Sequence, residues 1–232
     1  MPGKGKISGG MTPDAGKDQE ASVASEEGRF DLVETMAFDP IEGVRLLEYH
    51  LERMMRSADA LGFAFNRHAA RNELQAATFR LRQLSRVRLL LSRRGAMAIE
   101  IRPHESWPEA VMRVSAVARP VPAEDFRLRH KTTDRDFYSN CLRRGGTFEV
   151  LLFDQDGYLT EGCFSSLFVE QDDKLLTPPL ARGLLPGVLR QSLIDMGEAV
   201  EADLRMPDLE NGFFIGNAAR GLVAATLVEP AA

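Results

Sequence analysis

Apolar and polar residues alternate through residues 30–38, F-D-L-V-E-T-M-A-F, until Asp39-Pro40 ends the alternation. A period of two is typical of a half-buried β-strand, so the first predicted element is a strand. Beyond this break, apolar residues recur at helical spacing at Val44, Leu47, Leu51, Met54, Ala58 and Leu61. They predict an amphipathic helix that ends near Gly62. Arg53 lies beside the apolar stripe, where it either points into a cleft or is solvated.

A second helix is predicted at about residues 68–84. Three apolar runs follow, V-R-L-L-L, M-A-I-E-I and V-M-R-V-S-A-V-A, with Arg-Gly and Trp-Pro breaks between them. Such runs are typical of antiparallel strands. Helices packed on an antiparallel sheet predict an α+β lobe, and Pro120 and Pro122 mark a connector after it.

The pattern restarts after the connector with R-L-R-H-K-T-T-D-R-D-F-Y-S-N-C-L-R-R-G-G. Thr133 or Asp134 is a suitable N-cap for a short helix that stops at Gly145-Gly146. Lys131 therefore lies just ahead of a helix, at the end of an extended segment.

Asp156-Gly157 is a two-residue hairpin signal between the runs F-E-V-L-L-F and Y-L-T-E. Glu161 falls on the returning strand and shares a face with Leu159. Because an unpaired buried charge is very costly, this carboxylate is expected either at an exposed edge or buried with a partner. Further on, Pro186-Gly187 opens the amphipathic helix V-L-R-Q-S-L-I-D-M-G, whose free N–H groups and dipole suit an anion.

Composition narrows the class of protein. The chain has 232 residues and a net charge of -5, which gives no sign of a nucleic-acid partner. It has no apolar run long enough to cross a bilayer and no signal-peptide core, so we expect a cytoplasmic protein with no membrane partner. Residues 1–28 are almost devoid of apolar side chains and are expected to be disordered. Cys141 and Cys163 lack metal-like spacing, so no metal site is expected.

The candidate chemistry follows from a few residues. No H-x-x-x-H, Ser-His-Asp or glycine-rich nucleotide pattern can be assembled. Lys131, Glu161 and the helix start at Gly187 remain, and each alone is more often a solvated or structural feature. Together they are a lysine, a carboxylate and a phosphate cradle, the parts needed to hold pyridoxal phosphate (PLP).

The run E-G-C-F-S-S-L-F, followed by L-L-T and L-P-G-V-L-R, resembles the signature of the class IV aminotransferases, the fold-type-IV PLP enzymes. The resemblance covers about residues 30–229 and includes H-L-E-R-M, H-K-T-T-D-R-D-F-Y and F-F-I-G-N-A. It implies an α+β fold with a small α/β N-terminal lobe (29–118), a connector (119–122) and a larger C-terminal pseudo-barrel lobe (123–232). It also implies PLP in the cleft between them, and a homodimer.

The resemblance assigns roles by motif. It implies that Lys131 forms the Schiff base with PLP and that Glu161 contacts the pyridine nitrogen. Tyr138 is similar to the tyrosine that hydrogen-bonds the cofactor's phenolic oxygen, and Ser166 stands where the family has asparagine. The residues implied at the phosphate are Arg53, Gly187, Val188, Asn217 and Ala218.

Within the family, the motifs around Lys131 and Arg190 are most similar to the 4-amino-4-deoxychorismate lyase branch, which releases 4-aminobenzoate and pyruvate for folate synthesis. An aminotransferase acting on branched-chain or D-amino acids is the alternative, and a PLP-binding protein without turnover is a third. The small-molecule substrate is expected to contact residues lining the cleft, for which the candidates are Thr35, Arg86, Arg88 and Thr177.

Overall fold

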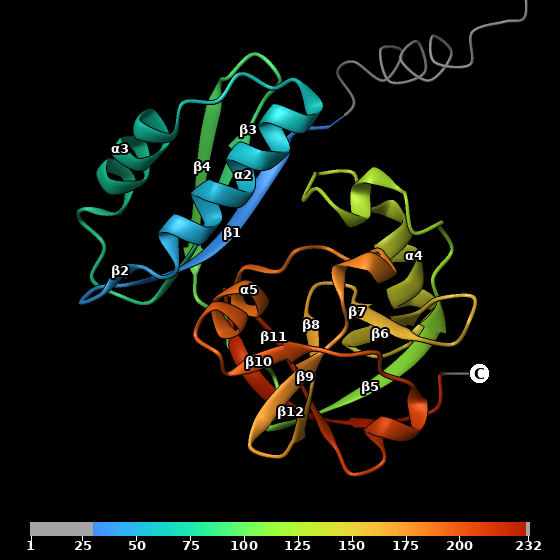
Figure 1. Cartoon of the computed structure of the whole chain (residues 1–232). Helices are drawn as coiled ribbons and strands as arrows, with labels where there is room; N and C mark the ends of the chain where they lie inside the picture. The colour runs from blue at the N-terminus through green and yellow to red at the C-terminus, as the bar shows by residue number, and fades with distance from the viewer. Residues whose placement is uncertain (1–29, 231–232) are drawn as a thin grey trace, which may run out of the picture.

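A computed structural model describes residues 30–230 of the chain, so the extension predicted to be disordered lies outside the described residues. The strands form a four-stranded sheet in the order β2-β1-β3-β4 and an eight-stranded sheet in the order β10-β9-β8-β11-β12-β5-β6-β7. Figure 1 shows the two sheets in separate lobes, the first in blue to green and the second in green to red. The α+β prediction is confirmed. Within residues 30–230 no helix combines the length and apolar character needed to span a membrane.

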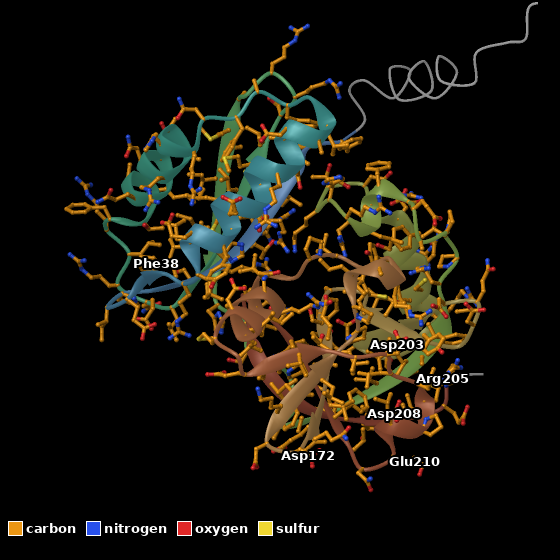
Figure 2. All side chains as sticks on the ribbon, viewed as in Figure 1. Phe38, Asp172, Asp203, Arg205, Asp208 and Glu210 are labelled. Atoms are coloured by element: carbon orange, nitrogen blue, oxygen red, sulfur yellow. The ribbon has the colours of Figure 1, made fainter. Side chains whose placement is uncertain are left out.

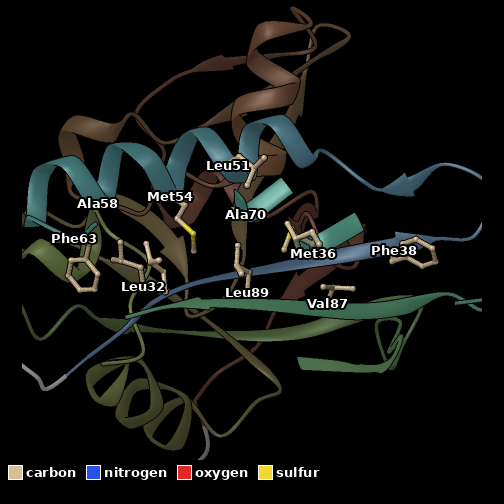
Figure 3. Packing of buried hydrophobic residues seen from close by; sticks show 12 residues of the cluster. Leu32, Met36, Phe38, Leu51, Met54, Ala58, Phe63, Ala70, Val87 and Leu89 are labelled. Atoms are coloured by element: carbon tan, nitrogen blue, oxygen red, sulfur yellow. The ribbon is translucent and has the colours of Figure 1, made fainter. Parts of the chain in front are cut away.

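The first lobe is built from the amphipathic helix packed on the small sheet. Its elements are β1 (Leu32–Asp39), β2 (Gly43–Val44), α2 (Leu47–Leu61), α3 (Arg67–Thr78), β3 (Ser85–Leu91) and β4 (Met97–Pro103). Figure 3 shows Leu51 and Met54 of α2 directed at Leu32, Met36 and Leu89 of the sheet. These side chains are at most 2% exposed. Each contributes roughly 1.5–3 kcal/mol through removal from water, so this apolar face fixes where α2 lies.

Two details of this lobe differ from the sequence prediction. β1 is buried on both faces instead of one, because α2 covers one face while Val33 and Thr35 of the other face line a cavity. The second helix ends at Thr78, earlier than predicted. Thr78 Oγ1 donates to the carbonyl of Leu74, and the N–H of Leu81 then bonds to Thr78 in a turn, so the chain leaves the helix there.

The second lobe contains the remaining elements. They are β5 (Val111–Ala118), η1 (Phe126–Leu128), α4 (Asp136–Gly145), β6 (Glu149–Phe153), β7 (Leu159–Gly162), β8 (Ser166–Gln171), β9 (Lys174–Thr177), η2 (Leu180–Arg182), α5 (Val188–Asp195), β10 (Ala199–Glu201), η3 (Met206–Leu209), β11 (Phe213–Asn217) and β12 (Gly221–Leu227).

The placement of β5 corrects one prediction. It was expected to be antiparallel to the strands before it, but it pairs in parallel with β6 and β12 of the larger sheet. Its buried residues Met112 and Val114 pack with Leu151 and Ile215 of the second core. The sheet membership favours a division between the lobes ahead of Val111, whereas the connector at 119–122 stays a prediction.

The segment around Lys131 is fixed by hydrogen bonds to β1. The N–H of Val33 donates to the carbonyl of Lys131 at 2.9 Å, and the N–H of Thr133 donates to Asp31 at 2.9 Å. The predicted capping by Thr133 or Asp134 is wrong. Arg135 is the N-cap of α4 without a side-chain bond, because Thr133 Oγ1 instead accepts from the N–H of Asp31. The predicted helix stop is confirmed by Gly146, which adopts a left-handed φ of 68°.

The β6–β7 hairpin has a longer turn than predicted. The N–H of Gly157 donates to the carbonyl of Asp154 at 3.1 Å, and Asp154 and Tyr158 close the turn at 2.8 Å. Three residues, 155–157, therefore form the loop, and Gly157 takes the position that needs a positive φ, here 79°. Glu161 still falls on the returning strand, as predicted.

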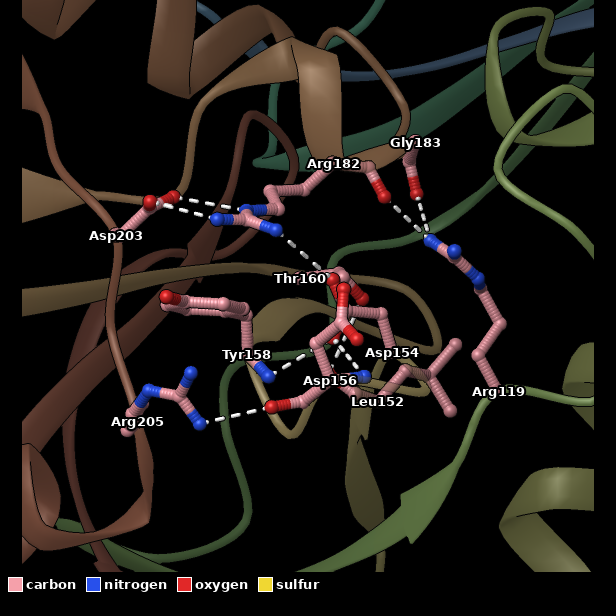
Figure 4. A network of polar contacts seen from close by, with 10 residues as sticks. All are labelled: Arg119, Leu152, Asp154, Asp156, Tyr158, Thr160, Arg182, Gly183, Asp203 and Arg205. Atoms are coloured by element: carbon pink, nitrogen blue, oxygen red, sulfur yellow. Dashed lines mark hydrogen bonds and ion pairs between the residues drawn. The ribbon is translucent and has the colours of Figure 1, made fainter.

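A network outside the cavity holds the chain that leads to Gly187. Arg182 and Arg205 stack on opposite sides of the Tyr158 ring in Figure 4, with guanidinium carbons 3.6 and 3.7 Å from its centroid. Arg182 also pairs with Asp203 at 2.7 Å, and Arg119 donates to the carbonyls of Arg182 and Gly183 at 2.6 Å. Figure 2 shows Asp203 and Arg205 on the side of the second lobe away from the first.

Gly145 provides a test of the packing of α4 on the sheet. A Cβ at this position would lie 2.4 Å from Val150 Cγ2 and 2.5 Å from Ser115 Oγ. Gly145→Ala is expected to lower the free energy of unfolding by about 1–3 kcal/mol, because overpacking outweighs the gain in helix propensity of roughly 1 kcal/mol. Chemical denaturation measures this. Ser139→Ala, on the exposed face of the same helix, is the control, and an unchanged or increased stability of Gly145→Ala would contradict the packing.

Candidate active site

A cavity of about 290 Å³ is lined by residues from both lobes. It brings together ten of the sequence-predicted site residues: Thr35, Arg53, Arg86, Arg88, Lys131, Glu161, Gly187, Val188, Asn217 and Ala218. Tyr138 and Thr177 are not among the described lining residues. Thr177 is fully buried in β9, so the structure gives it no access to a ligand in this cavity.

Lys131 lies in the cavity with other cationic groups around it. Burial lowers the pKa of its amine to about 7, and the positive charges of Arg53 and Arg135 act in the same direction. Glu34 opposes this shift but does not cancel it. The amine therefore has a substantial neutral fraction at neutral pH, which is the form that attacks a carbonyl or accepts a proton.

Glu161 is buried with partners, which decides between the two positions that its sequence allowed. It is 5% exposed; the Tyr138 hydroxyl donates to Oε1 at 2.6 Å and the N–H of Leu185 donates to Oε2 at 3.1 Å. Burial raises the pKa of this carboxyl to about 7 although both hydrogen bonds lower it. Glu161 thus holds or releases a proton near neutral pH at the cavity wall.

Tyr138 lies next to Glu161. Its predicted hydrogen bond to the cofactor's phenolic oxygen stays a prediction, and in the structure its hydroxyl donates to Glu161 and its side chain is only 2% exposed. The guanidinium carbon of Arg135 lies 4.0 Å from the centre of its ring. The structure therefore supports a role for Tyr138 in orienting Glu161.

Arg53 is directed into the molecule and is not solvated. The residue is 8% exposed, and its guanidinium donates to both carboxylate oxygens of Glu34, at 2.8 and 2.6 Å. Its Nη1 donates to the carbonyl of Pro186 at 3.1 Å, which joins the first lobe to the start of α5. Burial raises the pKa of Glu34, but Arg53 and His50 outweigh burial and bring it down to about 2. The carboxylate is thus ionised and holds Arg53 in one orientation.

Glu34 and His50 are site residues that the sequence analysis missed. His50 Nδ1 lies 2.6 Å from Glu34 Oε2, and since Glu34 is ionised, this nitrogen must be the donor. The Nε2 atom is buried without a hydrogen-bond partner among the described residues, and the side chain lines the cavity. Burial lowers the pKa of His50. The i, i+3 spacing of His50 and Arg53 on one helix face was the available signal.

The helix start at Gly187 is suited to an anion. Gly187 is the N-cap of α5 and makes no side-chain cap hydrogen bond, so the first N–H groups of the helix are open to a ligand. A Cβ on Gly187 would lie 2.5 Å from Ser166 Oγ, so only glycine lets the backbone approach this wall. Asn217 closes the neighbouring turn, since its Oδ1 accepts from the N–H groups of Ala219 and Arg220.

The site fits PLP, the cofactor that the resemblance implies. Lys131 and Glu161 supply the amine and the carboxyl, and the α5 start supplies free donors next to a buried arginine. His50 Nε2 has no hydrogen-bond partner among the described residues, and the main chain at Gly187 is not covered by a side chain of its own. A polar ligand in the cavity can supply hydrogen bonds to both. Ser166 packs against Gly187 in place of the family asparagine. Cys141 and Cys163 are buried free thiols.

Comparison with known proteins agrees with this geometry. A protein of Schizosaccharomyces pombe named "Putative aminodeoxychorismate lyase" is 29% identical over 192 residues, which cover 78% of this chain and 82% of that protein. The branched-chain-amino-acid aminotransferase of Escherichia coli is 35% identical over 63 residues, 27% of this chain and 20% of that enzyme.

A solved structure from Mesorhizobium loti, described as a putative amino-acid aminotransferase, superposes with a TM-score of 0.79 at 35% identity and covers 86% of this chain and 100% of that one. The family model described as "Amino-transferase class IV" matches residues 31–228. The protein is therefore an enzyme that belongs to the PLP-dependent class IV aminotransferase family.

Proposed function

We propose that this enzyme uses PLP to act as a 4-amino-4-deoxychorismate lyase that releases 4-aminobenzoate and pyruvate for folate synthesis. The observation that supports it most directly is the number of arginines in the cavity wall, where Arg86, Arg88, Arg135 and Arg220 lie in addition to Arg53, against the two carboxyl groups of Glu105 and Glu161. A substrate with two carboxylates matches this lining, whereas the apolar side chain of a branched-chain amino acid does not. The chain-long similarity to a lyase-named relative points the same way.

Pyridoxal phosphate, when bound, supplies the carbonyl that captures the substrate amine and a ring that accepts electrons. Lys131 then acts as the base: its amine takes the proton from the substrate carbon that carries nitrogen. The low pKa of Lys131, about 7, makes its neutral form abundant at neutral pH, so it accepts this proton without prior activation. The ring C–O bond to the enolpyruvyl group then breaks, and the electron pair left by the C–H bond completes the aromatic ring of the amine. The departing enolate takes up a proton, for which protonated Lys131 is the candidate donor, and becomes pyruvate.

Glu161 and Tyr138 act together at the cavity wall. Glu161 is the candidate partner of the cofactor's ring nitrogen, and a cation there favours the ionised carboxylate that burial alone disfavours. The Tyr138 hydroxyl and the N–H of Leu185 fix the two carboxylate oxygens, so the side chain needs little rearrangement. Arg53, the α5 start and Asn217-Ala218 are the candidate phosphate ligands.

An aminotransferase is the second candidate, because the Mesorhizobium loti structure is described as one and matches along its whole length. It uses the same lysine and carboxylate, so the cofactor residues do not separate the two reactions. The ionisable Lys131 and Glu161 argue against a PLP-binding protein without turnover. The homodimer and the cytoplasmic location remain predictions from the resemblance and the composition.

Lys131 is expected to react with pyridoxal phosphate in a pH-dependent manner that an ordinary lysine does not show. As pH rises through about 7, the amine loses its proton and becomes nucleophilic. Borohydride trapping between about pH 5 and about pH 9, followed by peptide mapping, should place the label on Lys131 with half-maximal labelling near neutrality. Exposed Lys174 is the internal reference. Labelling mainly at Lys174 would overturn the assignment.

Glu161→Gln is expected to retain the cofactor and to lose turnover by about 100-fold or more, equal to roughly 3 kcal/mol, because the shape remains and the charge is removed. Absorbance of the bound cofactor and steady-state rates measure the two effects separately. Glu170→Gln, at an exposed position of β8, is the control. Near-normal turnover in Glu161→Gln would show that the carboxyl is only structural.

The lyase assignment is tested by product analysis. With aminodeoxychorismate, the enzyme is expected to release 4-aminobenzoate and pyruvate in equal amounts without any 2-oxo acid, because the nitrogen leaves with the aromatic product. An aminotransferase instead transfers that nitrogen to the cofactor. Rapid loss of the cofactor's carbonyl absorbance with leucine or D-alanine alone, without 4-aminobenzoate formation, would assign the enzyme to the aminotransferase branch.

A further inference from the structure

One carboxylate in the cavity wall forms ion pairs with two arginines. Glu105 follows β4, and its Oε2 lies 3.1 Å from Arg220 Nη2 and 3.6 Å from Arg86 Nη1. Its side chain is 61% exposed, whereas that of Arg220 is 17% exposed. All three residues line the cavity that contains Lys131. An exposed, flexible side chain is thus the acidic partner of two arginines that are largely out of solvent.

Arg220 is held in one place by its surroundings. Its guanidinium carbon lies 5.6 Å from the ring centroids of Trp107 and Phe148 and 5.8 Å from that of Phe164. Its Nε donates to the main-chain carbonyl of Glu105 at 3.1 Å, a bond that does not depend on the Glu105 side chain. Burial lowers the pKa of Arg220, which shows that its charge is poorly solvated. The guanidinium group of Arg220 is therefore preorganised to bind an anion.

Arg53 and Arg88 have carboxylate partners of their own, and the charge of Glu100, the partner of Arg88, also acts on Arg86. Arg53 is already paired with Glu34, and Arg88 with Glu100 at 3.1 Å. The charges that act on Arg220 are those of Glu105, Arg86 and Glu149, a set distinct from the Arg53, Arg135 and Arg88 that surround Lys131. Arg86 also has a buried Nε without a hydrogen-bond partner among the described residues.

We propose that Arg220 and Arg86 form a carboxylate subsite of the substrate cavity and that the Glu105 side chain occupies this subsite until a substrate carboxylate displaces it. The inference rests on the proposed function, because it assigns one of the two carboxylates of that substrate to named residues. Two guanidinium groups bind a carboxylate with several charge-assisted hydrogen bonds, and Glu105 shows that a carboxylate fits between them. Displacing an exposed side chain costs little.

Glu105→Gln and Arg220→Lys are expected to have opposite effects on ligand binding. Isophthalate carries two carboxylates and benzoate one, and both can be titrated calorimetrically into the cofactor-loaded enzyme without turnover. Glu105→Gln removes the competing charge and should tighten isophthalate binding about threefold. Arg220→Lys removes the guanidinium group and should weaken isophthalate binding about tenfold. Benzoate, with one carboxylate, should change in the same directions and by no more than isophthalate does.

The controls are Glu170→Gln and Arg113→Lys, which make the same changes at exposed positions of β8 and β5 outside the cavity. An isophthalate affinity unchanged by both Glu105→Gln and Arg220→Lys would overturn the subsite. Weaker binding in Glu105→Gln would overturn it as well, because Glu105 would then be a structural support and not an occupant. Glu105→Gln changes an exposed side chain, so this test does not depend on the tolerance of the half-buried Arg220 position.

Turnover separates failure of the subsite from failure of the proposed reaction. With aminodeoxychorismate, Arg220→Lys should raise KM about tenfold and leave kcat within about twofold, since the subsite binds the substrate and does not touch the proton that moves. If 4-aminobenzoate forms but KM is unchanged, the subsite is wrong and the lyase assignment stands. If no 4-aminobenzoate forms but isophthalate binding follows the two variants as expected, the subsite stands and the reaction is wrong.

Discussion

The crowding of positive charges around one cavity is the constraint on which the site depends. A buried cation is tolerated only with a partner, and the structure pairs Arg53 with Glu34 and the partly exposed Arg88 with Glu100. No such ion pair of Lys131 is found among the described residues. Burial lowers the pKa of its amine most, and the positive charges of Arg53 and Arg135 lower it further. The reactivity of the lysine is thus set by its burial and by the neighbouring arginines.

The two lobes are joined at this site by specific hydrogen bonds. Arg53 of α2 reaches the carbonyl of Pro186, immediately before the helix start that is suited to an anion. The main chain of β1 is hydrogen-bonded to Lys131. Side chains alternate along this strand, so Glu34 faces α2 on one side and Val33 lines the cavity on the other. A displacement of one lobe would therefore move the lysine, the arginine and the anion site together.

Local signals predicted the parts of the site that local structure determines. Lys131 precedes a helix, Glu161 follows a turn and Gly187 opens a helix, and each can be recognised within about ten residues of sequence. The parallel pairing of β5 could not be recognised in this way, because its partners β6 and β12 lie far along the chain. The hydrogen bond from the Tyr138 hydroxyl to Glu161 could not be recognised either, since Glu161 is on another element. The reactive groups can thus be identified from the sequence, whereas the residues that position them cannot.

The support of the α5 start by the outer network has a consequence for the response to salt. Arg182 reaches Asp203, whose side chain is 45% exposed, whereas the Arg53–Glu34 pair at the cavity is shielded. At an ionic strength of about 1 M the Debye length falls to roughly 3 Å, and exposed pairs are screened long before buried ones. Added salt is therefore expected to weaken the Arg182–Asp203 pair, which supports the loop before Gly187, before it weakens the Arg53–Glu34 pair at the cavity. The loop and the cavity wall thus differ in their sensitivity to ionic strength.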